Sequence, residues 1–202
     1  MHKSVGQVPD FAGAHKSMGK APDFAGAHKS MGRLRTSPEQ ERMQSMFRKM
    51  RRFKQQLADE EALDVLKEGH LGVLSVLGDD DYPYGLPIDY FCDEDGHLYF
   101  HGAKEGHKID AIARHDKVSF CVMDEGKPDG GFARYVRSVI VFGRIAPVED
   151  HQRVLDAAWK LSMHIYPEQK EFYREDLRKN GDRVQILELV PEQITGKLVH
   201  ER

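Results

Sequence analysis

The stretch Leu98-Tyr-Phe-His-Gly-Ala-Lys-Glu-Gly-His-Lys-Ile-Asp-Ala-Ile-Ala-Arg114 runs from a strand pattern into a helix start through a short basic loop. The first N–H groups of a helix have no partner within the helix and carry a partial positive charge. Glycine lets the backbone come close to an anion held there, and lysine supplies charge of the right sign. We therefore predict a phosphate-binding turn over residues 102–108, built on Gly102, Lys104, Gly106 and Lys108. We call this turn the cradle.

Phe100 and His101 end the strand that leads into the cradle. A flat ring attached to the phosphate can lie beside such a pair, so a phosphorylated aromatic cofactor fits the combination. The same residues also fit an ordinary strand-to-helix turn with solvated lysines, because a single basic glycine loop is a weak motif.

Hydrophobic periodicity over the rest of the chain predicts a mainly β protein with flanking helices. Strands are expected over 71–77, 84–91, 98–102, 117–123, 134–148, 184–190 and 194–199. Helices are expected over 37–56, 60–68, 107–114, 150–165 and 168–178. Consecutive strands joined by hairpins, with helices inserted at the corners, favour an antiparallel barrel over a doubly wound parallel sheet.

Three parts follow one another along the chain. Residues 1–32 are a tandem repeat of period 13, too short and too rich in Gly, Ala and Pro to build a stacked core, so we expect a disordered or loosely docked extension. The phase-matched His2, His15 and His28 either share a metal ion or are solvated copies, and the second interpretation is favoured. Residues 33–57 are expected to form a basic N-terminal helix, and residues 58–202 the barrel domain.

The net charge of −3 hides an asymmetry, since residues 1–54 carry +8 and the remainder −11. The basic part either contacts nucleic acid or is a solvated helix face, and the absence of a nucleic-acid-binding motif favours the solvated face. No apolar run approaches the ~20 residues that span a bilayer, and the N-terminal residues lack the apolar region of about 7–15 residues typical of a signal peptide, so a cytoplasmic protein with no membrane partner is expected. Cys92 and Cys121 lack metal-ligand spacing, which predicts free thiols and no metal site.

Six motifs in their order and spacing resemble the pyridoxamine 5′-phosphate oxidase-like FMN-binding split-barrel superfamily, and within it the nitroimidazole-reductase (Nim-type) branch. They are Met50-Arg-Arg, Gly85-Leu-Pro-Ile-Asp-Tyr, the strand and cradle from Leu98 to Lys108, Val118-Ser-Phe, Arg137-Ser-Val-Ile-Val-Phe-Gly and Ile194-Thr-Gly-Lys. The resemblance covers the chain from about Met50 to the C-terminus. It implies a six-stranded antiparallel split β-barrel that works as a homodimer, with FMN in clefts between subunits. We expect strand 134–148 to contribute to the dimer interface.

The resemblance also implies a set of cofactor contacts. Lys108 and the turn of Gly106 and His107 would hold the FMN phosphate, and Lys104 would add charge. The ring would lie along Leu86, Pro87 and Ile88, with Phe100 and His101 beside it.

Two further positions carry over from the same resemblance. Arg137 and Ser138 would contact the ribityl chain or the phosphate. Val136, which precedes them, stands where the branch has tyrosine, although Tyr135 is adjacent. That departure concerns the substrate side of the pocket more than the cofactor side.

The activity implied is that of an FMN-dependent oxidoreductase that reduces a small aromatic or nitro compound with NAD(P)H. His101 is the catalytic candidate, and a purely structural histidine is the other interpretation of this residue. A flavin carries the redox chemistry itself, so the absence of a Ser-His-Asp set, a G-x-S-x-G motif, an H-E-x-x-H motif and a Walker loop does not oppose this activity. A split barrel that binds F420 or heme, and a flavin-binding protein without turnover, remain as alternatives.

Overall fold

The computed structural model describes residues 46–201, which all fall in one compact unit. The predicted repeat extension, and the predicted basic helix as far as residue 45, lie outside the described residues. The strands are β1 Leu71–Leu77, β2 Pro83–Asp89, β3 Phe91–Cys92, β4 Leu98–Gly102, β5 Lys117–Met123, β6 Lys127–Pro128, β7 Arg134–Pro147 and β8 Gln185–Glu201. The helices are α2 Asp59–Glu68, α3 His107–Arg114, α4 His151–Ile165 and α5 Lys170–Asn180, with short 3₁₀ turns η1 Phe53–Gln55, η2 Asp79–Asp81, η3 Pro167–Gln169 and η4 Gly181–Arg183.

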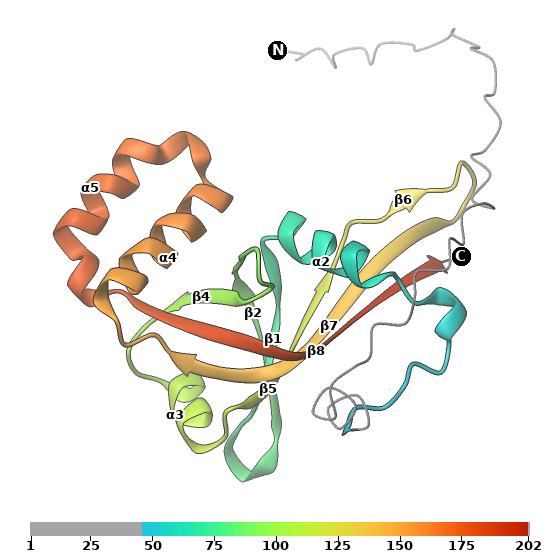
Figure 1. Ribbon diagram of the computed structural model, residues 1–202, viewed down its shortest axis with the longest axis horizontal. Helices are drawn as coiled ribbons and strands as arrows, with labels where there is room; N and C mark the ends of the chain where they lie inside the picture. Colours follow the sequence, from blue (N-terminus) through green and yellow to red (C-terminus); the bar gives the residue numbers. More distant parts are fainter. Residues whose placement is uncertain (1–45, 202) are drawn as a thin grey trace, which may run out of the picture. The chain divides into compact units, whose positions relative to one another are not determined.

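All the described strands form one antiparallel sheet in the order β2-β1-β5-β7-β8-β4-β3, with β6 paired to β7. Six of them have five or more residues. The sheet curls so that β2 comes against β4, yet no hydrogen-bonded ladder joins these two strands in the described chain. The predicted fold, an antiparallel split barrel with flanking helices, is confirmed (Figure 1).

At Tyr90 the chain passes directly from β2, at one end of the strand order, to β3 at the other end. The predicted strand 84–91 is divided there: β2 pairs with β1, and β3 pairs with β4 at the opposite end of the strand order. Tyr90 is fully buried, its hydroxyl donates to the Leu66 carbonyl (2.7 Å) and its N–H donates to the His70 carbonyl (2.9 Å). These two bonds hold Tyr90 in place between β2 and β3.

Alternation of apolar residues along the strands fills the inside of the curl. Leu74 and Val76 of β1 face inward with Phe120 of β5, while their neighbours along the strands remain at least partly exposed. Phe120 meets the rings of Tyr90 (4.9 Å) and Phe100 (5.0 Å) edge to face. Each fully buried side chain of this size contributes about 1.5–3 kcal/mol, so this cluster is the main source of stability.

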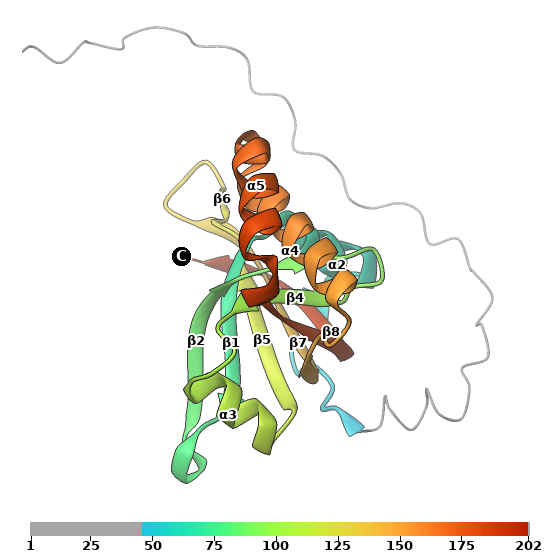
Figure 2. The same cartoon turned by 90° about the vertical axis from the view of Figure 1, so that its left-hand side faces the viewer.

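The helices cover the ends of the curl and leave much of the outer face of β1, β5 and β7 exposed. Helix α4 packs its Val154, Ala157 and Ala158 against Ile186 of β8 and the Tyr99 side of β4. Helix α3 lies at the far end of the sheet, beside the turn between β1 and β2 (Figure 2). No described helix is long and apolar enough to cross a bilayer.

Two sequence-based expectations are corrected. The helix expected over 37–56 is absent over residues 47–56, where only the short 3₁₀ turn η1 is helical. Gln56 bridges to Lys197 and the Leu57 N–H donates to the Gly196 carbonyl (3.0 Å), so pairing with β8 replaces helical hydrogen bonds. The two expected final strands form one continuous strand, β8. Pro191, which separates the two predicted ranges, lies opposite Gly143 at a shift in the pairing register between β7 and β8, and pairing continues on both sides of it.

Candidate functional site

The cradle lies where β4 ends and α3 begins, as predicted. Gly106 caps the helix at φ +116°, a backbone conformation that favours glycine, and a Cβ there would meet nothing within 4 Å. Its carbonyl accepts from Ile109 (2.8 Å) and Asp110 (3.1 Å). Within residues 46–201 the N–H groups of His107 and Lys108 find no acceptor, so they remain available to an anion beside Gly106.

Lys108 directs its ammonium group back over the start of the cradle. A Cβ added to Gly102 would lie 2.7 Å from Lys108 Nζ, so only glycine leaves room for the ammonium group at this position. Burial lowers the pKa of Lys108, and none of the ion pairs in the described chain involves it. A half-buried cation without a carboxylate partner, on the same turn as free N–H groups, can bind an oxyanion such as a phosphate.

Two predicted contacts point away from this position. Lys104 donates from Nζ to the Asp182 carbonyl in η4 (2.9 Å), which ties the cradle to the segment after α5. The His107 ring stacks on Tyr84 of β2, with centroids 4.4 Å apart, and its Nε2 lies 3.6 Å from Asp79. His107 therefore offers its backbone N–H to an anion while its ring serves another contact.

Phe100 and His101 point to opposite faces of β4. The Phe100 side chain is fully buried in the core, so it offers only backbone to a ligand. His101 is exposed on the same face as Tyr99, toward the helices α4 and α5. Desolvation lowers the pKa of His101, the nearby charge of Lys108 lowers it further, and Asp176 of α5 opposes both.

The predicted ring contacts lie on the strand that borders the open side of the barrel. Leu86 and Ile88 are half-buried and pack against the core, and Pro87 between them is exposed on the outer face. Because β2 pairs only with β1 among the described strands, its other edge has no strand partner there and faces the gap between β2 and β4.

Arg137 and Ser138 are not brought to the cradle within one chain. Ser138 pairs with Met123, whereas the cradle begins near the other end of β7, about 30 Å away along the strand at ~3.3 Å per residue. Arg137 donates to Asp124 (2.8 Å) and Glu68 (2.9 Å), and its hydrogen bond from Nε to Asp124 chiefly raises its pKa. A contact of Arg137 or Ser138 with the ligand of this cradle would need a second copy of the chain.

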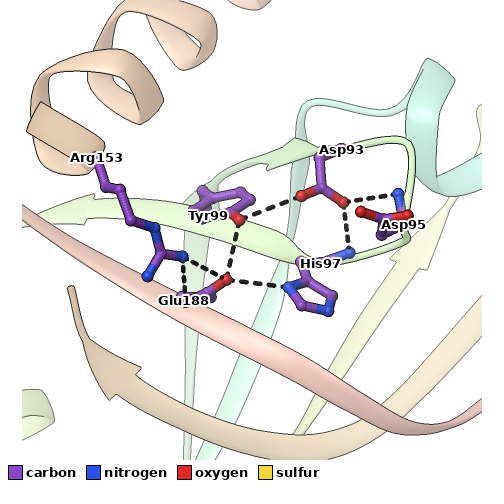
Figure 3. A network of polar contacts seen from close by, with 6 residues as sticks. All are labelled: Asp93, Asp95, His97, Tyr99, Arg153 and Glu188. Atoms are coloured by element: carbon purple, nitrogen blue, oxygen red, sulfur yellow. Dashed lines mark hydrogen bonds and ion pairs between the residues drawn. The ribbon is translucent and has the colours of Figure 1, made fainter.

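A polar cluster that sequence analysis missed holds β4 in place (Figure 3). Glu188 of β8 accepts from Tyr99 (2.9 Å), from Arg153 of α4 (3.0 and 2.9 Å) and contacts His97 Nδ1 (3.0 Å). Burial alone would raise the pKa of Glu188, but these hydrogen bonds outweigh burial and lower it. The partners are up to 91 residues apart, so no local spacing could reveal the cluster.

Comparison with known proteins agrees with this architecture. Residues 58–198 match the sequence model of the family described as pyridoxamine 5′-phosphate oxidase. No curated protein matches the chain significantly.

Solved structures show the same fold at low sequence identity. A candidate 5-nitroimidazole antibiotic resistance protein of Bacteroides thetaiotaomicron is 18% identical, with a TM-score of 0.60 over 72% of this chain and 87% of its own. An FAD-binding protein of Mesorhizobium loti is 23% identical, with a TM-score of 0.55 over 71% of this chain and 96% of its own. An FAD- and heme-binding protein of Mycobacterium smegmatis is 21% identical, with a TM-score of 0.57 over 71% of this chain and 73% of its own.

The predicted superfamily is confirmed, and the Bacteroides structure is consistent with the Nim-type branch. Since the match covers more than half of the chain and includes the curled sheet, both strands that border the gap and the cradle, this protein belongs to the pyridoxamine 5′-phosphate oxidase family.

Proposed function

We propose that this chain binds FMN and acts as an oxidoreductase that reduces a small aromatic or nitro compound with a nicotinamide donor. The observation that carries the proposal is that the Lys108 ammonium group lies over Gly102, on the same loop whose free N–H groups open α3. This arrangement fits the phosphate of a cofactor, and the unpaired edge of β2 beside it fits the polar edge of a flat ring.

A bound flavin would supply the electron transfer itself. The work left to the chain is to hold the phosphate, through Lys108 and the start of α3, and to provide walls and backbone dipoles along Leu86, Pro87 and Ile88. His101 is an exposed titratable group directly before the cradle, and it is our candidate for delivering a proton to the substrate.

The same proposal includes a homodimer. Pro87, Val73, Cys121 and Ile140 are aligned across four neighbouring strands on the outer face of the sheet. Val73 and Ile140 each keep 42% of their surface exposed, although the solvated face of an antiparallel sheet usually carries polar side chains. A second copy on this face would bury the row, and it would also allow Arg137 and Ser138 to act on a ligand held by the partner.

The visible spectrum of the purified protein and a pair of binding titrations test this function. We expect a yellow protein that binds FMN more tightly than riboflavin, and Lys108→Ala should weaken FMN binding by about 1.5–3 kcal/mol, as for a hydrogen bond to a charged group. Riboflavin lacks the phosphate, so its affinity should stay unchanged. Equal losses for the two ligands would show that Lys108 does not bind the phosphate.

A second candidate keeps the fold but changes the cofactor. The Mesorhizobium and Mycobacterium structures are described as FAD-binding and as FAD- and heme-binding, and His101 is an exposed imidazole, a side chain of the kind that ligates heme iron. A Soret band in the spectrum, or FAD as the flavin released on denaturation, would favour this candidate over FMN.

A further inference from the structure

The turn between β1 and β2 is unusual in its backbone and in what it contacts. Asp80 (φ 53°) and Asp81 (φ 61°) both adopt the left-handed conformation, and they are the non-glycine residues that do so within the described chain. Such a conformation costs free energy and persists where surrounding contacts maintain it. The first residue of the turn, Asp79, contacts two residues of α3.

Asp79 joins the turn to both ends of α3. Its Oδ1 accepts from Arg114 at the end of the helix (2.7 Å), and its Oδ2 lies 3.6 Å from Nε2 of His107 at the beginning. The His107 ring is also stacked nearly parallel, at 10°, on Tyr84 of β2. One turn of the barrel therefore holds the helix whose N-terminus forms the cradle.

The contact joins the two parts of the proposed flavin site. Tyr84 lies two residues before Leu86 on the strand assigned to the ring, and His107 follows Gly106 in the turn assigned to the phosphate. A ribityl chain of limited length joins the ring of a flavin to its phosphate, so the affinity depends on how well the protein presets the separation of the two sites.

We propose that Asp79 and Tyr84 are positioning residues, which hold α3 against β2 so that the cradle meets the phosphate of a ligand whose ring lies along β2. The inference rests on the proposed flavin site. Neither residue touches the cofactor in this scheme, because Asp79 acts through His107 and Arg114 and Tyr84 acts through His107.

The test compares FMN with riboflavin in two pairs of variants. Asp79→Asn removes the charge from the contact, and Asp80→Asn is its control in the same turn, since Asp80 forms no ion pair in the described chain and asparagine tolerates its backbone conformation. Tyr84→Leu removes the stacked ring, and Tyr84→Phe retains it. The melting temperature of each ligand-free variant reports whether the fold is intact.

We expect Asp79→Asn and Tyr84→Leu to weaken FMN binding about three- to tenfold, on the scale of an exposed ion pair or an aromatic contact, while riboflavin binding changes less than twofold. Asp80→Asn and Tyr84→Phe should bind both ligands as the parent does. An equal loss for FMN and riboflavin, or no loss for either, would overturn the positioning role.

The parent protein separates this outcome from a failure of the proposed function. If the parent does not prefer FMN to riboflavin, the phosphate site itself is wrong. If it does prefer FMN and the Asp79→Asn and Tyr84→Leu variants keep that preference, only the positioning role is refuted.

Discussion

Gly102→Ala should disable the cradle without removing any of its functional groups. The new Cβ would lie 2.7 Å from Lys108 Nζ, whereas ordinary contacts begin near 3.4 Å, so the ammonium group must retreat by roughly 0.7 Å or more. A charge-assisted hydrogen bond of about 2.8 Å would then lengthen to about 3.5 Å, where little of it remains. The expected loss is about 1.5–3 kcal/mol, which is a roughly 10- to 150-fold weaker affinity for FMN.

The fold should tolerate the change, because the atom displaced is the flexible end of a side chain. Replacing glycine by alanine also lowers the conformational entropy of the unfolded chain. This stabilises the folded state by about 0.4–1 kcal/mol, which offsets part of any strain. Isothermal titration with FMN and riboflavin measures the effect, and Gly131→Ala in the remote β6–β7 loop is the control, since its nearest contact would be an ordinary 3.4 Å. Unchanged FMN affinity, or a parallel loss of riboflavin, would refute the position assigned to the phosphate.

Three other predictions address the dimer, the catalytic candidate and the polar cluster. Ile140→Asp should convert a particle of about twice the 23.1 kDa chain mass into a monomer by analytical ultracentrifugation, and a parent that is already monomeric while binding FMN would exclude the shared cleft. His101→Ala should keep its flavin but lower turnover per bound flavin by ~10²-fold, and in the parent this rate should fall as pH rises through the lowered pKa of His101, because only the protonated imidazole carries the proton to be donated. Preserved turnover with lost flavin would make His101 structural. Glu188→Gln should lower the free energy of unfolding at pH 7 by about 1–2 kcal/mol, measured by urea denaturation. Because folding lowers the pKa of Glu188, the difference in stability between parent and variant should shrink as the pH falls below the ordinary pKa of 4.5 and through the folded value. A difference that stays constant with pH would contradict this linkage.

Local patterns predicted most of the elements, because burial follows strand and helix periodicity closely in this chain. The bounds of β1, β4, α3 and β5 agree with the predicted ranges, and their alternating or amphipathic residues face the core as expected. The division at Tyr90 could not be predicted, since it depends on a hydroxyl contact with Leu66 from another element.

The candidate site was predicted in part for the same reason. The cradle is local, so its glycines, Lys108 and the start of α3 could be identified from one stretch of sequence. The side-chain directions of Lys104 and His107 depend on Asp182 and Tyr84, which are distant in sequence. The sequence Gly78-Asp79-Asp80-Asp81 indicates an acidic turn but no role for Asp79. The left-handed backbone of Asp80 and Asp81 in the structure is what draws attention to it.

The open side of the barrel has a consequence for the protein before any ligand arrives. Where β2 and β4 fail to pair, each strand presents an edge that can template pairing with another chain, which is a common start of aggregation. Pro83, Pro87 and Asp89 interrupt the edge of β2, but β4 has no such residues over Phe100 to Gly102. A ligand held across the gap would cover this edge, so the yield of soluble protein in an expressing cell should depend on how much of the ligand that cell supplies.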